Sequence, residues 1–127
     1  MNLVVSLRIP TGWWVAKNDF YDLSPEVLDG NLSPAGVFVQ DILSIERWRG
    51  GTPVSPEQDF VLDLGWYPDG DPEGRYRLVL LRKNWDHVLQ TFESRDRYAI
   101  QRTLDRWLEL CNAATGLDQL VEQLQRE

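Results

Sequence analysis

Apolar and polar residues alternate along several stretches of the chain, which is the pattern of β-strands with one buried face. The clearest stretch runs from residue 60 to residue 66, where every second side chain is aromatic or Leu. Residues 75–82 repeat the pattern after a connector rich in Pro, Gly and Asp. The two stretches predict a β-hairpin with a long loop. Residues 3–9 alternate in the same way and predict an N-terminal strand.

Three shorter stretches predict the remaining strands. Residues 13–17 follow a Pro-Thr-Gly turn signal and predict a short extended segment. Residues 37–48 fit either a strand or a helical stripe, and the β-forming run Val-Phe-Val at their start favours a strand. Residues 87–92 follow another turn and predict the third strand of a meander.

Two segments have the composition of loops. Residues 18–36 are rich in Asn, Asp, Ser, Gly and Pro, which favour turns. Within them, Ser24 followed by Pro25 could open one helical turn. Residues 49–56 form a second predicted loop. A loop as long as the first is uncommon in a compact domain and is often functional.

The C-terminal third predicts two helices. From about Arg95 to Ala113, apolar residues recur at helical spacing, with Ser94 as the N-cap. Gly116 is a natural stop for this helix, and the residues after it predict a short second one. We therefore expect an α+β fold, with an antiparallel sheet of about five strands and two C-terminal helices packed on one face. The expected domain organisation is a single domain over residues 1–127.

Composition supports a stable core without disulfides. The 127 residues are 43% hydrophobic and include six Trp, and a chain of this size buries roughly two thirds of its unfolded surface. Cys111 is the only cysteine, which excludes an intramolecular disulfide and fits a reducing compartment. The N-terminal apolar run is short and interrupted by Arg8, which disfavours a signal peptide, and the chain has no apolar run long enough to span a membrane. We expect a cytoplasmic protein without membrane contact.

The net charge of −7 is concentrated in the middle of the chain. From Asp19 to Glu73 there are twelve acidic and two basic residues, a balance of −10, and the remaining eight acidic and eleven basic residues give +3. Such a region repels nucleic acid phosphates and attracts a basic partner. The alternative is that the charge only maintains solubility.

The candidate catalytic and metal-binding motifs do not meet the geometry that their chemistry requires. The turn at Asp69–Gly74 resembles a calcium loop, but predicted strands flank it and Pro interrupts it. Asp59 and Asp63 would stand about 13 Å apart on a strand, too far for a glycosidase pair. His87 is the only histidine, and one histidine with one cysteine supplies too few zinc ligands. We therefore expect no metal, no cofactor and no enzymatic activity.

Two further patterns admit a functional and a structural interpretation. The first predicted helix carries four arginines, which could form a stripe for RNA: Arg95, Arg97, Arg102 and Arg106. Acidic residues are interleaved with them, and this favours a solvated face of mixed charge.

Adjacent Trp13 and Trp14 must point to opposite faces of a strand, so one of them leaves the core. Tyr67 and Trp85 lie near turns. Exposed aromatic rings beside carboxylates are typical of a protein-binding hot spot, and the same rings could equally close the ends of the core.

The order of segments, and two stretches above all, resemble bacterial immunity proteins of contact-dependent growth inhibition and polymorphic toxin systems. These stretches are Asp-Leu-Gly-Trp-Tyr-Pro-Asp-Gly-Asp-Pro-Glu-Gly-Arg-Tyr-Arg-Leu at residues 63–78 and Phe-Glu-Ser-Arg-Asp at residues 92–96. The block from Trp13 to Asp22 adds to the likeness, which covers about half of the chain. The resemblance implies a protein that binds and neutralises the toxic C-terminal domain of a cognate toxin, usually a nuclease. It brings no catalytic signature.

An acidic surface would complement the basic surface of a nuclease and speed association. We expect the contact to use carboxylates and aromatic rings of the acidic region: Asp19, Tyr21, Asp22, Trp66, Tyr67, Asp69, Asp71 and Glu73. The expected partner is the toxin domain and not nucleic acid, and the protein itself is expected to be a monomer or a weak homodimer. Two other classes stay open: a small enzyme that uses carboxylates and His87, and a structural or regulatory protein that self-associates.

Overall fold

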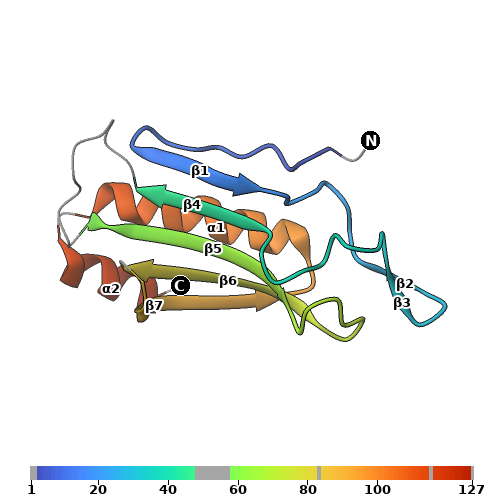
Figure 1. Ribbon diagram of the computed structural model, residues 1–127. Coiled ribbons are helices and arrows are strands. Elements are labelled where there is room, and N and C mark those ends of the chain that lie inside the picture. Colours follow the sequence, from blue (N-terminus) through green and yellow to red (C-terminus); the bar gives the residue numbers. More distant parts are fainter. Residues whose placement is uncertain (1–2, 48–57, 83, 115, 127) are drawn as a thin grey trace.

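The computed structural model describes residues 3–47, 58–82, 84–114 and 116–126 (Figure 1). The main sheet has five antiparallel strands, which lie side by side in the order in which the chain forms them. They are β1 (Trp13–Asn18), β4 (Leu43–Arg47), β5 (Phe60–Tyr67), β6 (Arg75–Arg82) and β7 (Asn84–Ser94). A separate hairpin pairs β2 (Glu26–Leu28) with β3 (Asn31–Ser33).

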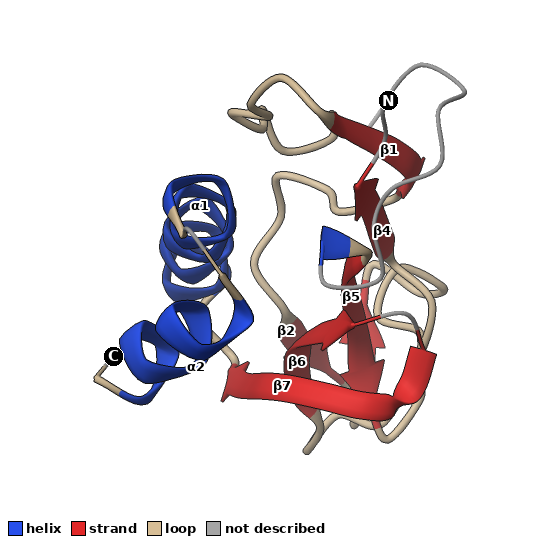
Figure 2. Ribbon diagram, turned by 90° about the vertical axis from the view of Figure 1, so that its left-hand side faces the viewer, coloured by secondary structure: helices blue, strands red, loops and turns tan. Residues whose placement is uncertain are grey.

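Two helices follow the sheet in the chain, α1 (Arg97–Ala113) and α2 (Leu117–Gln125). Both lie on one side of the main sheet (Figure 2). The predicted α+β fold, with a five-stranded antiparallel sheet and two C-terminal helices on one face, is confirmed.

The core lies between the helices and the sheet. The alternation on β5 is as predicted, because Phe60, Leu62, Leu64 and Trp66 are all buried. The strand register places Leu43 of β4 and Leu78 of β6 on either side of Leu64, so the buried side chains continue across the sheet. The buried face of α1 consists of Ile100, Leu104, Trp107, Leu108, Leu110 and Cys111.

The helix ends differ slightly from the prediction. Asp96, and not Ser94, is the N-cap of α1, and its carboxylate accepts a hydrogen bond from the Tyr98 N–H at 2.9 Å. The Ser94 hydroxyl instead accepts from the N–H of Asp96, the N-cap residue itself, at 3.0 Å. Helix α1 ends with Ala114 as its C-cap, and Gly116 is the N-cap of α2.

Residues 3–9 are not a strand of the main sheet. Val4 makes one isolated bridge with Tyr21, while Val5 is buried in the core. The side-chain amide of Gln101 on α1 donates to the carbonyl oxygen of Ser6 at 3.1 Å. The alternation in this segment therefore reflects the burial of one side of an extended chain. The backbone of this chain does not pair along its length with a neighbouring strand.

The segment predicted as a loop over residues 18–36 contains the β2–β3 hairpin, which extends beyond one end of the main sheet (Figure 1). Asp29 and Gly30 turn the chain with φ angles of 52° and 78°, the positive values that a two-residue hairpin turn requires. The predicted helical turn at Ser24 is wrong, because Glu26 begins β2.

Of the described residues 37–47, only β4 forms a strand, and the Val-Phe-Val run precedes it. The backbone of that run still bonds to the end of β5, since the Trp66 N–H donates to the Val39 carbonyl at 2.7 Å. The next residue, Gln40, passes so close to Gly65 that a Cβ added to Gly65 would lie 2.0 Å from the Gln40 carbonyl oxygen. Only glycine fits at that position. The predicted loop over residues 49–56 lies outside the described residues.

The two outermost strands of the sheet are irregular. The pairing of β1 with β4 shifts register between Val15 and Lys17. The pairing of β6 with β7 shifts twice, between Leu80 and Arg82. Strand β7 also begins at Asn84, three residues before the predicted start.

Candidate partner-binding surface

Four aromatic rings close the end of the core next to the hairpin. The ring centroid of Trp66 lies 5.0 Å from that of Phe38 and 5.1 Å from that of Tyr76. Phe20 packs edge-on against Tyr76 at 5.6 Å. Trp66 is 0% exposed, so it does not lie on the surface where the sequence had placed it. It supports that surface from below.

The connection between β5 and β6, residues 68–74, is called the acidic loop here. Its backbone is fixed by hydrogen bonds to the core and to the neighbouring segment. The Trp66 indole N–H donates to the Asp71 carbonyl at 2.9 Å, and the Gly70 N–H donates to the Phe38 carbonyl at 2.9 Å. Within the loop, the Gly74 N–H donates to the Asp71 carbonyl, also at 2.9 Å. The loop therefore has a defined shape before any partner binds.

Three carboxylates project from this fixed backbone. Asp69 accepts from the Gln40 N–H through Oδ1 at 3.0 Å, and Asp71 accepts from the Glu73 N–H through Oδ1 at 2.9 Å. Asp69 and Glu73 are exposed, and Asp71 is half-buried. Within the described part of the chain, none of the three forms an ion pair with Lys or Arg. In the same part of the chain, the nearest cation that contacts the loop is Arg95, whose guanidinium donates to the Gly74 carbonyl and not to any of the three carboxylates.

Tyr67 stands at the base of the acidic loop and is half-buried. Its hydroxyl donates to the Gln40 carbonyl at 3.3 Å, and the Arg77 guanidinium lies 4.7 Å from its ring centroid. Burial, followed by the charge of Asp63, raises the pKa of the Tyr67 hydroxyl. The hydroxyl therefore stays protonated and can act as a hydrogen-bond donor.

Asp19, Tyr21 and Asp22 lie on the segment that leads into the hairpin. Both Asp carboxylates form an ion pair. Asp22 pairs with Arg97, and an Asp19 oxygen lies 3.7 Å from the Lys17 ammonium. Tyr21 is half-buried beside its bridge to Val4. The carboxylates of Asp19 and Asp22 thus differ from those of the acidic loop in having ion-pair partners among the described residues.

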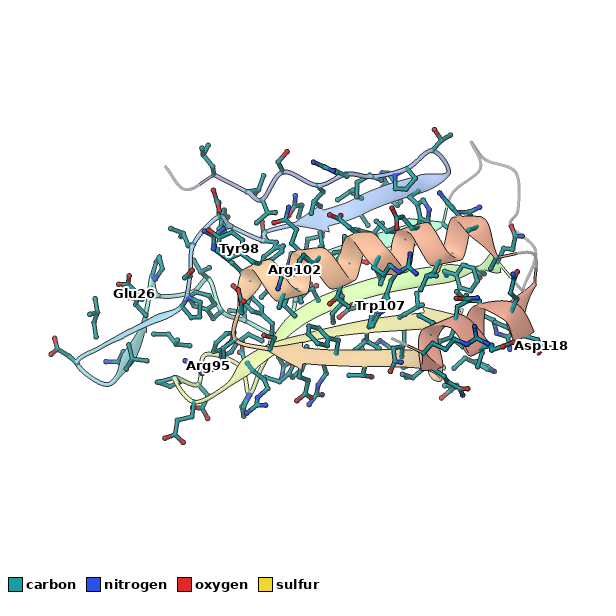
Figure 3. The ribbon with its side chains drawn as sticks, turned by 180° about the vertical axis from the view of Figure 1, so that it is seen from behind. Glu26, Arg95, Tyr98, Arg102, Trp107 and Asp118 are labelled. Carbon is teal, nitrogen blue, oxygen red and sulfur yellow. The ribbon has the colours of Figure 1, made fainter. Side chains whose placement is uncertain are left out.

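The hairpin is a part of the surface that the sequence analysis missed. It exposes Val27 and Leu28, which are 49% and 57% exposed, between the carboxylates of Glu26 and Asp29. Glu26 lies beyond the end of α1 that carries Tyr98 (Figure 3). The signal that could have located the hairpin is the Asp-Gly pair at residues 29–30, flanked by apolar residues.

The hairpin and the acidic loop meet at a pocket of about 360 Å³. Residues 34–36 and Phe38 line it from the chain after β3, and Gly70 lines it from the acidic loop. Asn31 and Leu32 of β3 complete the lining, so the hairpin and the acidic loop border the same pocket.

Asp63, His87 and Cys111, which the sequence singles out as candidates for chemistry, lie on three different elements. Asp63 lies on the helix-free face, where burial and, secondarily, the charge of Asp41 raise its pKa to about 6. His87 is exposed on β7. Cys111 is on the buried face of α1, and burial raises its pKa to about 12. Among the described residues, no group of three or more His, Cys, Asp or Glu is placed to hold a metal ion.

Comparisons of the chain with protein-family models, with curated proteins and with solved structures give no match. In the described part of the chain, no helix combines the length and the apolar character needed to cross a bilayer.

Proposed function

We propose that this protein is an immunity protein that binds and neutralises a cognate bacterial toxin domain, with a nuclease as the expected class of toxin. The acidic loop is the centre of the contact surface. The observation that carries the proposal is that Asp69, Asp71 and Glu73 project without ion-pair partners among the described residues from a backbone already fixed by hydrogen bonds.

A fixed loop of this kind favours tight binding. Because the backbone is ordered before contact, little conformational entropy remains to be lost on association. Among the described residues, the three carboxylates outnumber the one cation, Arg95, that contacts the loop, so they produce a negative potential that attracts a basic surface over long range. A nuclease domain needs a basic surface to hold phosphates, and carboxylates occupying that surface would block the substrate.

The hairpin supplies the apolar part of the same contact. Val27 and Leu28 are exposed at its end, and Glu26 and Asp29 surround them with charge. An apolar centre with a polar rim is the usual arrangement of a protein–protein interface. The hairpin would thus contribute binding energy, and the acidic loop would contribute orientation and speed.

A neutralising variant tests the surface without disturbing the loop. Asp69→Asn, Asp71→Asn and Glu73→Gln together remove three charges, and the Asn side chains retain the acceptor oxygens used by the two backbone N–H groups. We expect the association rate with the toxin domain encoded beside its gene to fall by roughly tenfold or more at low salt, with a weaker salt dependence. Stopped-flow mixing at several salt concentrations measures both quantities.

The matched control removes three charges from the helices, by Glu109→Gln, Asp118→Asn and Glu122→Gln, and should change the association rate much less. Equal rates in the two triple variants would exclude the acidic loop as the contact surface. The function itself is tested separately, by co-expression of toxin and protein in a growing culture. Failure of the wild-type protein to restore growth would overturn the proposal.

A further inference from the structure

The helix layer leaves part of the sheet uncovered beside β7. Helix α2 ends against this strand, where the Gln90 side-chain amide donates to the Leu124 carbonyl at 3.2 Å. Further along β7, a groove of about 470 Å³ lies between this strand and α1. Residues 90–92 line one wall, and Arg102, Thr103, Arg106 and Trp107 line the other. Figure 3 labels Arg102 and Trp107 on α1.

The groove has apolar surface at its base. Phe92 pairs with Leu78 in the strand register, so its ring is on the helix side of the sheet, and it is half-buried. Trp107 lines the groove although it is only 2% exposed. The volume lies within the range of about 300–1,000 Å³ that is usual for small-molecule sites.

Two arginines give the groove a positive charge in a protein whose net charge is −7. Arg102 and Arg106 are one helical turn apart, so they project from the same side of α1. Arg106 lies 3.4 Å from the Glu109 carboxylate. Arg102 has no ion-pair partner among the described residues.

Two other polar side chains of the groove, Thr103 and Gln90, are already engaged within the protein. The Thr103 hydroxyl donates to the Ala99 carbonyl at 2.8 Å. The Gln90 side-chain oxygen accepts from the Thr91 N–H at 3.0 Å. Because these groups are satisfied, Arg102 is the group best placed to hold a ligand. Guanidinium groups bind carboxylates, sulfonates and phosphates through paired hydrogen bonds.

We infer that this groove binds a small organic anion, with its acidic head at Arg102 and Arg106 and its apolar body along Phe92 and Trp107. None of these residues belongs to the acidic loop or to the hairpin. The site is therefore independent of the toxin contact proposed above, and a ligand could occupy it in the free protein or in a complex.

A dye with this chemistry, 8-anilinonaphthalene-1-sulfonate, serves as the probe. Titration into the ¹⁵N-labelled protein should shift the backbone amide signals of residues 90–92 and 102–107, and dye fluorescence should rise in parallel. Arg102→Gln should weaken dye binding by roughly fivefold, and adding Arg106→Gln should weaken it further. Arg75→Gln, which removes an exposed arginine of β6 that does not line the groove, should leave it unchanged.

A neutral dye of similar shape, N-phenyl-1-naphthylamine, tests the need for a negative charge and should bind more weakly than the sulfonate. Equal binding of the two dyes would overturn the inference. So would signal shifts centred on the exposed Trp14 and Trp85 instead of the groove. Circular dichroism spectra that match the wild type would show that the arginine variants are folded.

Discussion

The indole N–H of Trp66 donates a hydrogen bond to the carbonyl oxygen of Asp71 at 2.9 Å. This bond joins a fully buried ring of the core to the middle of the acidic loop. The ring of Trp66 also packs against Gly74, where an added Cβ would lie 2.5 Å from the indole nitrogen. The shape of the loop is therefore set by the core, although its carboxylates face solvent.

Removing this bond should destabilise the protein and loosen the loop. Trp66→Phe leaves the Asp71 carbonyl without its indole donor and creates a small cavity, so we expect a loss of about 2 kcal/mol in the free energy of unfolding. Urea denaturation measures this loss, and faster hydrogen exchange at the Gly74 N–H should accompany it. Trp14→Phe is the control, because Trp14 is 52% exposed and its loss should cost less than about 0.5 kcal/mol.

Asn112 should stabilise the packing of α1 on the edge of the sheet. Its side-chain oxygen accepts from the Trp13 indole N–H at 3.0 Å and from the Arg47 guanidinium. Asn112→Ala removes both bonds and should lower the free energy of unfolding by about 1–2 kcal/mol. Asn112→Asp keeps the acceptor and adds a charge beside Arg47, so its stability should equal or exceed that of the wild type. If both variants lost the same stability, the acceptor would have no role.

Asp63 should make stability depend on pH in an unusual direction. Its pKa in the folded protein is raised from 3.8 to about 6 by burial and by the charge of Asp41. The carboxyl therefore favours folding when it is protonated, below about pH 4, and this contribution is lost as the pH rises towards 6. Asp63→Asn, which mimics the protonated form, should be more stable than the wild type at neutral pH by about 1 kcal/mol, a value reduced for solvent screening.

The difference between Asp63→Asn and the wild type should disappear near pH 4 (about the ordinary pKa of Asp). Denaturant titrations over this pH range give the comparison. A constant difference at every pH would mean that the variant acts through packing and not through ionisation of Asp63.

Cys111 should be unreactive in the folded protein. It is buried, and burial raises the pKa of its thiol to about 12, which leaves almost no thiolate at neutral pH. A disulfide reagent such as Ellman's reagent should react slowly in buffer and rapidly in concentrated urea. The control combines Cys111→Ala with Ala113→Cys, which moves the thiol to an exposed position on the same helix and should give fast reaction in buffer. Rapid reaction of the wild-type thiol in buffer would contradict its burial.

The amphipathic elements were predictable because their periodicity depends directly on burial. Strand β5 and helix α1 have the expected buried residues. Strand β6 buries the expected face, but Val79 and Leu81 on its opposite face are buried as well. The prediction that one of Trp13 and Trp14 leaves the core is confirmed, since Trp13 is 7% exposed and Trp14 is 52% exposed. Residues 3–9 alternate without forming a strand of the main sheet. Alternation follows from side-chain burial, but a strand also needs a neighbouring backbone to bond with, and a local pattern carries no information about that neighbour.

The candidate surface was only partly predictable. The acidic loop was visible as a turn-rich connector, and its carboxylates lie on one element. Trp66 was expected on the contact surface, but it is buried. Its place in the alternation of β5 already put it on the core face. The β2–β3 hairpin was missed because its strands are short and its exposed Val27 and Leu28 give no burial pattern. The groove beside β7 depends on where α2 ends against the sheet. That position is set by tertiary packing, which no local sequence pattern encodes.

The register shifts in β1 and β7 have a consequence for how molecules of this protein meet one another. A sheet grows by adding a strand whose donors and acceptors match the spacing of the last one. Both border strands interrupt that spacing, β1 between Val15 and Lys17 and β7 opposite Leu80–Arg82. A strand of a second molecule that paired with β1 or β7 would lose its hydrogen-bond register after a few residues. These irregularities therefore protect a concentrated solution of the protein against aggregation by edge-to-edge strand pairing.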